Sequence, residues 1–182
     1  MSIVMINGGS RENGNTNLLS ARAVHGLEVD IIQLDEYNIS PIVDERHAEG
    51  GFSEVADDFM QVMDRVMEYD KIIFATPIYW YTMTGTMKQF IDRWSQAMRE
   101  DRYHDLRERM ARKKGYVIAV GGDSPYIKGL PLLQQFKYIF DFVHLPFEGY
   151  VLGQANKPGE IEQDKKALYS ADLLNQTLKE DT

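Results

Sequence analysis

The sequence predicts a doubly wound α/β fold, in which helices cover both faces of a parallel sheet. Short apolar runs rich in β-branched residues recur along the chain, at 3–6, 29–34, 71–75, 116–120 and 145–152. Segments with helical spacing of apolar residues lie between these runs. Strands that alternate with helices form parallel sheets whose helices pack on both sides.

Five strands leave few arrangements, because crossovers between parallel strands are right-handed. The flavodoxin-like strand order 2-1-3-4-5 suits a chain of this length. In that order the loops after the first, third and fourth strands lie side by side at the carboxyl edge of the sheet. Open α/β sheets bind their ligands at this edge, where neighbouring crossovers go to opposite faces.

The composition narrows the class of protein. The chain has 182 residues, with no linker or repeat, so residues 1–182 are expected to form a single domain. Its net charge of −8 argues against a nucleic-acid partner, and its lack of cysteine excludes thiol nucleophiles and cysteine-ligated clusters. The four histidines show no ligand-like spacing, so no metal site is predicted. No apolar run reaches membrane-spanning length, and a cytoplasmic location is expected by default.

The stretches between the strands carry the expected helices. The first begins at Asn15 or Thr16, with a short polar side chain as its cap, and Gly26 ends it. The basic run 107–114 is interpreted as a solvated helix end, within a charged segment, 99–114, of unclear organisation. The other helices are predicted from apolar residues that share one face: Phe52, Val55, Phe59, Val62, Met63 and Val66; Met87, Phe90, Ile91, Trp94 and Met98; Leu133, Phe136, Ile139, Phe140 and Val143; Ala167, Ala171, Leu174 and Leu178.

The loop 7–17 follows the first strand and leads into a helix. It consists of Gly, Asn, Ser and Thr with one Arg and one Glu, and offers backbone N–H groups, hydroxyls and a helix N-terminus. These groups suit a phosphate. The loop lacks the Gly-Lys-Ser/Thr of an NTP-binding P-loop and the spacing of a dinucleotide fold. A simple turn with a helix cap would also explain its composition.

Two further loops at the same edge offer a flat surface. Loop 76–84 places Tyr79, Trp80 and Tyr81 directly after the third strand, as a wall for a planar ligand or as an interface. Loop 121–126 begins with two glycines, which let a flat heterocycle approach the backbone closely. A phosphate cradle beside a ring wall and bare backbone matches the parts of FMN.

Two motifs carry a resemblance to a known family. The first is Gly-Gly-Ser-Arg-Glu-Asn-Gly-Asn-Thr at 8–16, and the second joins Thr-Pro-Ile-Tyr-Trp at 76–80 to Thr84, Gly85, Lys88, Phe90, Ile91, Asp92 and Arg93. Together they resemble the flavodoxin-like NAD(P)H-dependent FMN reductase and quinone reductase family. The resemblance implies noncovalently bound FMN, NADPH or NADH as electron donor, and transfer to flavin, quinone or similar flat acceptors. It also implies a homodimer or homotetramer.

The family's binding residues carry over to matching positions. The resemblance assigns the FMN phosphate to Ser10, Arg11, Asn15, Thr16 and Asn17. It assigns the isoalloxazine environment to Pro77, Ile78, Tyr79, Trp80, Gly121, Gly122 and Asp123. No catalytic acid, base or nucleophile is expected, because the cofactor supplies the chemistry.

One departure separates this chain from relatives of the iron–sulfur flavoprotein type. Those relatives carry a cysteine cluster in the loop after the second strand, following a stretch like Ile39-Ser40-Pro41. Here residues 42–47 read Ile-Val-Asp-Glu-Arg-His, without cysteine. A cluster-bearing relay is therefore excluded, and this loop is left for an interface or a lid.

Two other functions fit the same fold. A flavodoxin-type electron carrier would bind FMN without turning over NAD(P)H, and the acidic net charge suits it. A nucleotide or sugar-phosphate binding module would use the phosphate cradle without redox chemistry. The Tyr-Trp-Tyr run at 79–81 favours the reductase over the carrier.

Overall fold

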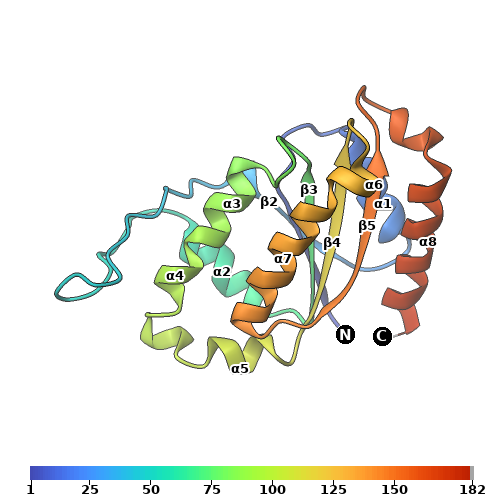
Figure 1. The fold of residues 1–182 in the computed structure, drawn as a ribbon. Helices are drawn as coiled ribbons and strands as arrows, with labels where there is room; N and C mark the ends of the chain where they lie inside the picture. The colour runs from blue at the N-terminus through green and yellow to red at the C-terminus, as the bar shows by residue number, and fades with distance from the viewer. Residues whose placement is uncertain (181–182) are drawn as a thin grey trace.

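The computed structural model describes residues 1–180 and confirms the predicted topology. Five strands form one sheet in the order β2-β1-β3-β4-β5, and every neighbouring pair is parallel (Figure 1). The strands are β1 (Ile3–Asn7), β2 (Asp30–Gln33), β3 (Lys71–Pro77), β4 (Lys114–Gly121) and β5 (Phe147–Gln154). Because all strands point the same way, the loops that follow them emerge at a single edge.

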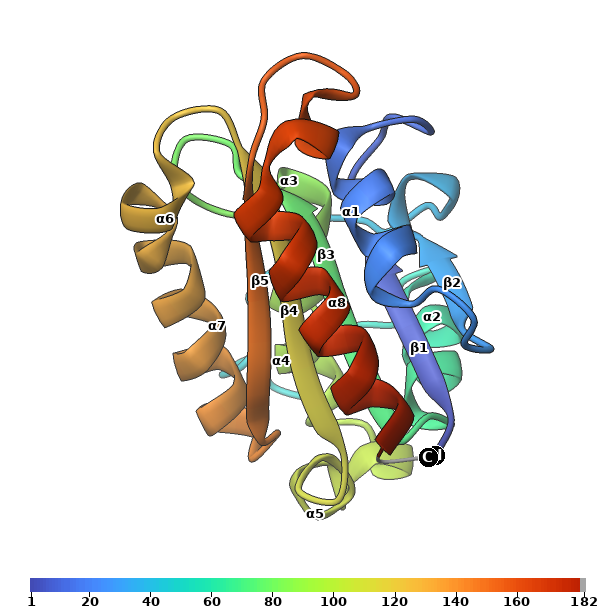
Figure 2. The ribbon, with the colours of Figure 1, turned by 90° about the vertical axis from the view of Figure 1, so that its right-hand side faces the viewer.

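Two helical layers cover the sheet. α1 (Asn15–Ala23) and α8 (Lys165–Glu180) pack side by side on one face, in front of the strands in Figure 2. The other face is covered by α2 (Phe59–Met67), α3 (Gly85–Asp92), α4 (Trp94–Ala97) and α7 (Leu130–Val143), with α5 (Leu106–Met110) at the end remote from the loops. The remaining elements are α6 (Pro125–Lys128) and the 3-10 turns η1 (Leu34–Glu36), η2 (Asp101–Tyr103) and η3 (Glu160–Gln163).

Alternation along the strands divides the core into two clusters. In β1, Ile3 and Met5 pack toward α1 and α8, whereas Val4 and Ile6 pack toward the opposite layer. Successive side chains of a strand point to opposite faces, so a strand buried on both sides is apolar throughout. Within residues 1–180, no helix combines the length and the apolar character that a membrane crossing requires.

The second helix is shorter than its apolar spacing predicts. α2 begins at Phe59, and Phe52 and Val55 lie in the preceding loop, so their assignment to the buried helix face is wrong. Asp57 explains where the helix begins. Its carboxylate accepts a hydrogen bond from the Phe59 N–H at 3.1 Å and is also bonded to Arg93, which holds the chain out of helical geometry before this point.

The loop between η1 and α2 projects away from the sheet (Figure 1). Arg93 joins the two ends of this loop. Its Nη1 lies 2.5 Å from Asp57 Oδ2 and donates to the Ser40 carbonyl at 3.0 Å. The Arg93 and Asp57 side chains are 2% and 1% exposed, so this ion pair is buried. The resemblance includes Arg93 in its second motif, but only the structure shows that Arg93 holds this loop.

The charged segment after α4 is also ordered by tertiary contacts. It forms η2 and α5, and its Lys113 is buried rather than solvated as expected for the basic run. Lys113 Nζ donates to the carbonyls of Met67 and Tyr69, at the C-terminus of α2. Burial lowers the pKa of Lys113, and the carbonyls that end α2 receive its hydrogen bonds.

Candidate functional site

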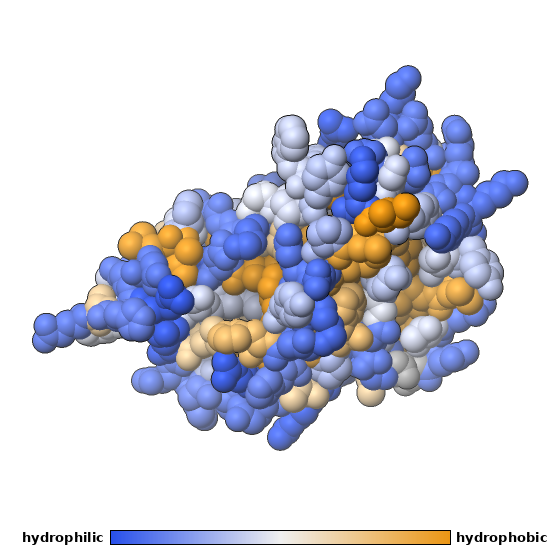
Figure 3. Space-filling model, viewed as in Figure 1, coloured by the Kyte–Doolittle hydropathy of each residue, from blue (hydrophilic) through white to orange (hydrophobic). Residues whose placement is uncertain are grey.

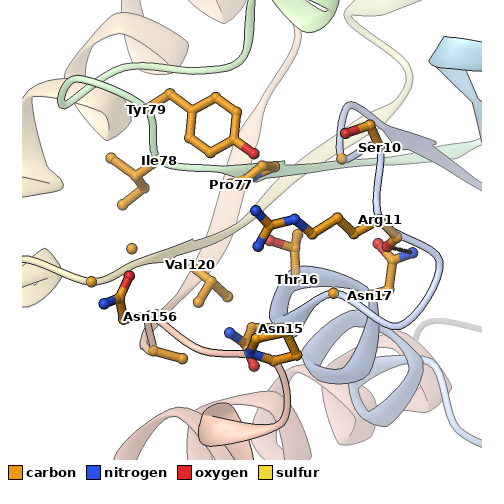
Figure 4. Close-up of a pocket in the computed structure, with 16 residues that line it drawn as sticks. Ser10, Arg11, Asn15, Thr16, Asn17, Pro77, Ile78, Tyr79, Val120 and Asn156 are labelled. Carbon is orange, nitrogen blue, oxygen red and sulfur yellow. Dashed lines mark hydrogen bonds between the residues drawn. The ribbon is translucent and has the colours of Figure 1, made fainter.

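A cavity of about 260 Å³ opens at the carboxyl edge of the sheet, bounded by the loops after β1, β3, β4 and β5 (Figure 4). Ten of the twelve site residues taken from the sequence line it: Ser10, Arg11, Asn15, Thr16, Asn17, Pro77, Ile78, Tyr79, Gly121 and Gly122. Parallel strands bring these loops together, although the residues are more than 100 positions apart in the chain.

The other two residues, Trp80 and Asp123, line an adjoining cavity of about 410 Å³. Ile78, Gly121, Gly122 and Asn156 belong to both cavities and form the wall between them. The structure therefore separates Trp80 and Asp123 from the cavity that contains the polar loop.

The N-terminus of α1 faces the first cavity without a cap. The expected short polar cap is wrong: the N-cap residue is Gly14, and no side chain within residues 1–180 caps the first helical turn. The first turn contains no acidic residue either. The N–H groups of a first turn have no intrahelical acceptor, and the helix dipole favours an anion there. This helix end is thus open to a phosphate.

Two of the expected phosphate ligands use their side chains elsewhere. Asn15 donates to the Lys157 carbonyl at 2.9 Å and accepts from the Ile161 N–H, which fastens the loop after β5. Asn17 donates to the carbonyls of Arg11 and Glu12, and its oxygen accepts from Asn7. Both residues therefore shape the cradle with their amides, and only their backbone N–H groups remain for a ligand.

Ser10, Arg11 and Thr16 keep their polar side chains at the cavity. None of the three makes a side-chain hydrogen bond within residues 1–180, and Arg11 extends from the loop toward the cavity in Figure 4. A guanidinium, two hydroxyls and an uncapped helix end form a donor-rich surface. Such a surface matches a phosphate dianion, which accepts several charge-assisted hydrogen bonds.

The aromatic loop forms a tight two-residue turn. Tyr79 and Thr82 exchange two backbone hydrogen bonds of 3.0 Å, and the residues between them, Trp80 and Tyr81, have φ values of 48° and 65°. Bulky side chains rarely adopt this left-handed conformation, which costs about 1–2 kcal/mol per residue. The turn leaves Trp80 93% exposed beside the second cavity.

A polar network fastens this turn to the loop after β4. Asp123 Oδ2 accepts hydrogen bonds from Lys128 Nζ at 2.6 Å and from the Tyr81 hydroxyl at 2.9 Å. The hydrogen bond from Lys128, then that from Tyr81, lowers the pKa of Asp123 below its ordinary value. The three side chains are polar partners of one another, and Trp80 lines the second cavity beside them.

The glycines of the loop after β4 permit close approach. A Cβ atom on Gly121 would lie 3.1 Å from Ile78 Cβ, and one on Gly122 would lie 3.3 Å from Asn156 Cβ. Side chains at these two positions would displace the wall between the cavities. The absence of side chains at these positions permits a ligand to approach the backbone closely.

The sequence interpretation missed the loop after β5. Asn156 from this loop lines both cavities, and Ala155 N–H donates to the Gly121 carbonyl at 3.0 Å. The signal that could have found it is its position after the fifth strand, with Pro158 and Gly159 marking a turn. The switch point itself involves only the first, third and fourth strands, and so it does not point to this loop.

In the part of the chain that the structure covers, no group of His, Asp and Glu side chains is arranged to hold a metal ion.

Fold and site together define a class: a flavodoxin-like α/β protein with an uncapped helix end and two adjoining cavities at the carboxyl edge of its sheet. Comparison with known proteins specifies the family. A family model of NADPH-dependent FMN reductases matches residues 1–157, and the chain belongs to this family.

Individual relatives agree with this assignment. The chain is 52% identical over 174 residues, 96% of either sequence, to YwqN of Bacillus subtilis strain 168, which is named provisionally as an NAD(P)H-dependent FMN-containing oxidoreductase. A solved structure described as the Trp repressor binding protein of Bacillus subtilis is 44% identical, with a TM-score of 0.81 over 95% of this chain and 97% of that one. An FMN-dependent NADH-azoreductase from Bacillus anthracis, solved with FMN, shares the fold at 13% identity, with a TM-score of 0.70 over 98% and 99% of the two chains.

Proposed function

We propose that this chain binds FMN in the two adjoining cavities and catalyses electron transfer from NADPH or NADH to a flavin, a quinone or a similar flat acceptor. The observation that carries the proposal is the uncapped N-terminus of α1, which opens, with Arg11, into the same cavity as the bare backbone of the loop after β4. FMN, when bound, supplies the hydride chemistry, so the protein needs to bind, orient and exclude water.

Each loop has a role in this proposal. The side chains of Ser10, Arg11 and Thr16, with the backbone N–H groups of Asn15 and Asn17, hold the phosphate. The isoalloxazine lies against Pro77, Ile78, Tyr79, Gly121 and Gly122. Trp80 and Asp123 border the ring in the adjoining cavity, and the donor and the acceptor stack in turn on its exposed face. No side chain acts as a catalytic acid, base or nucleophile.

Turnover of the purified protein tests this function. The protein is loaded with FMN and mixed with NADH or NADPH, with and without a quinone, while nicotinamide absorbance is followed. Steady oxidation that requires both FMN and the quinone is expected. FMN binding without turnover of either nicotinamide would instead identify an electron carrier. A protein that gains no flavin spectrum on adding FMN would leave only the phosphate-binding module.

The proposal includes a homodimer or homotetramer. An apolar groove of about 360 Å³ lies between α3, α4 and α7, where hydrophobic residues gather on the face seen in Figure 3. Trp94 and Ile139 line the groove, and Tyr138 and Phe142 on its border are 63% and 58% exposed. A second copy would cover this surface. Sedimentation of the FMN-loaded protein as a monomer at micromolar concentration would contradict this part.

A cytoplasmic location, where reduced nicotinamides are available, and the absence of a nucleic-acid partner complete the proposal. The single domain expected for residues 1–182 would then carry the whole activity. Separation of a cell lysate into cytosolic and membrane fractions, followed by immunoblotting for this chain, checks the location. Recovery in the membrane fraction would contradict it.

A further inference from the structure

Three carboxamide side chains line the first cavity, and they differ in how they are used. Asn15 and Asn17 each employ both the oxygen and the nitrogen of the amide in hydrogen bonds within the chain. Asn156 employs neither, since its only hydrogen bond in residues 1–180 comes from its backbone N–H. One complete donor–acceptor pair is therefore left free at the cavity.

The backbone around this free amide is held in place. The N–H groups of Asn156 and Lys157 both donate to Glu160 Oε2 at 2.9 Å, and these two bonds lower the pKa of the Glu160 carboxyl group. Ala155 is bonded to Gly121, and Asn15 to the Lys157 carbonyl. A loop fixed by four bonds presents the Asn156 side chain at a defined position.

That position is the wall shared by the two cavities, away from the phosphate cradle. Asn156 packs against Gly122, where an added Cβ would lie 3.3 Å from Asn156 Cβ and 3.4 Å from its Oδ1. Figure 4 places Asn156 on the opposite side of the cavity from Ser10 and Asn17. The other polar side chains of the second cavity, Tyr81, Asp123 and Lys128, already bond to one another.

We infer that Asn156 recognises the pyrimidine edge of the flavin ring, as a positioning residue that accepts from its N3–H and donates to a neighbouring carbonyl oxygen. This inference rests on the proposed function. An imide edge presents one donor between two acceptors, and a carboxamide is the side chain that matches a donor and an acceptor side by side. The phosphate cradle and Asn156 then fix the two ends of the cofactor.

Binding of FMN and of 3-methyl-FMN, which lacks the N3–H, tests the assignment. Both are titrated into the cofactor-free protein by flavin fluorescence, for the wild type, for Asn156→Ala and for Gln163→Ala. Gln163 is an exposed carboxamide on the same segment that lines neither cavity, and it controls for loop damage.

The wild type and Gln163→Ala are expected to prefer FMN over 3-methyl-FMN by about tenfold, the worth of a well-formed hydrogen bond. Asn156→Ala should bind FMN about tenfold more weakly and lose the preference. A preference that survives in Asn156→Ala overturns the inference, as does a wild type that binds both flavins equally. A wild type that binds neither flavin overturns the proposed function itself.

The reduction potential of the bound FMN provides a second test. In Asn156→Asp a carboxylate still accepts from N3–H, but it repels the negative charge that reduced flavin gains. We expect the affinity for reduced FMN to fall about tenfold relative to oxidised FMN, which corresponds to a potential about 30 mV lower for a two-electron couple. An unchanged potential would place Asn156 away from the ring and overturn the inference.

Discussion

The loops after β1 and β2 show two ways to hold a segment of chain. The loop after β1 is short, and it is fastened by neutral amides, chiefly the Asn7–Asn17 pair and the bonds from Asn17 to the carbonyls of Arg11 and Glu12. The loop after β2 is long and projects from the sheet, and Arg93 joins its two ends through a buried ion pair with Asp57 and a hydrogen bond to the Ser40 carbonyl.

The difference follows from what each loop must leave free. A buried carboxylate in the loop after β1 would repel a phosphate, whereas an amide fastens the backbone and adds no net charge. The loop after β2 lines neither cavity, so a charged pair there does not interfere with an anionic ligand. The loop beside the cavity is held by uncharged amides, and the loop away from the cavity is held by an ion pair. Both arrangements are consistent with an anion site at the N-terminus of α1.

Replacement of Arg93 should have the largest effect. Arg93→Met leaves Asp57 buried without its partner, and a broken buried pair costs about 3–5 kcal/mol in the free energy of unfolding. Urea unfolding measures the loss. Arg22→Met is the matched control, because it removes an exposed pair with Asp172 at 2.7 Å. A loss no greater than in the control would show that the Arg93–Asp57 ion pair does not stabilise the loop after β2.

Replacement of Arg11 should affect binding rather than folding. Arg11→Ala removes the cation that lines the first cavity, and FMN should bind about 10- to 100-fold more weakly, as expected for charge-assisted hydrogen bonds. Riboflavin, which lacks the phosphate, should bind equally well to both proteins in a fluorescence titration. Arg46→Ala, on the projecting loop, should bind FMN like the wild type. Equal losses for FMN and riboflavin would assign Arg11 to the ring instead.

Substitution of one glycine in each loop distinguishes the effect of close packing from the effect of backbone conformation. A Cβ on Gly8 would lie 2.8 Å from Thr84 Oγ1 and 3.0 Å from Met87 Cβ. Gly8→Ala should therefore cost about 1–3 kcal/mol by overpacking, and it should weaken FMN binding.

Gly51 has a φ of 79° and nothing within 4 Å of an added Cβ. Gly51→Ala should cost about 1 kcal/mol through backbone strain alone, with FMN binding unchanged. Thermal unfolding and FMN titration of both variants measure the two effects. Weakened FMN binding in Gly51→Ala would show that the projecting loop communicates with the cavity.

A change of pH near neutrality should have the smallest effect on the free energy of unfolding. Burial of Asp57 alone would raise its pKa, but hydrogen bonds from Arg93 and from the N–H groups of Ser40 and Phe59 outweigh burial and lower it. A lowered pKa contributes stability above the ordinary carboxyl value of about 3.9, and this contribution is lost as the pH falls through the folded pKa. The difference in unfolding free energy between wild type and Asp57→Asn should shrink below about pH 4. A difference that stays constant down to pH 2 would contradict this assignment.

The sequence by itself determined the sheet and the place of the site. Apolar runs mark strands locally, and the rules of connection order them, so the strand order and the meeting of three loops needed no tertiary information. The same reasoning reached ten residues of the first cavity, and seven of them lie within the two local motifs. Periodicity failed at α2, where Phe52 and Val55 continue the helical spacing outside the helix.

Only the tertiary structure decided which polar groups are used and which are free. The amide of Asn15 is engaged by the carbonyl of Lys157, 142 positions away, and Arg93 meets Asp57 across 36 positions. The amide of Asn156, an exposed residue, makes no hydrogen bond within residues 1–180. A hydrogen bond depends on distance and angle between atoms that the fold brings together, and no spacing along the chain encodes it. The sequence therefore located the polar loop at the cavity, and the fold decided that its asparagines fasten the backbone while Arg11 and an uncapped helix end line the cavity.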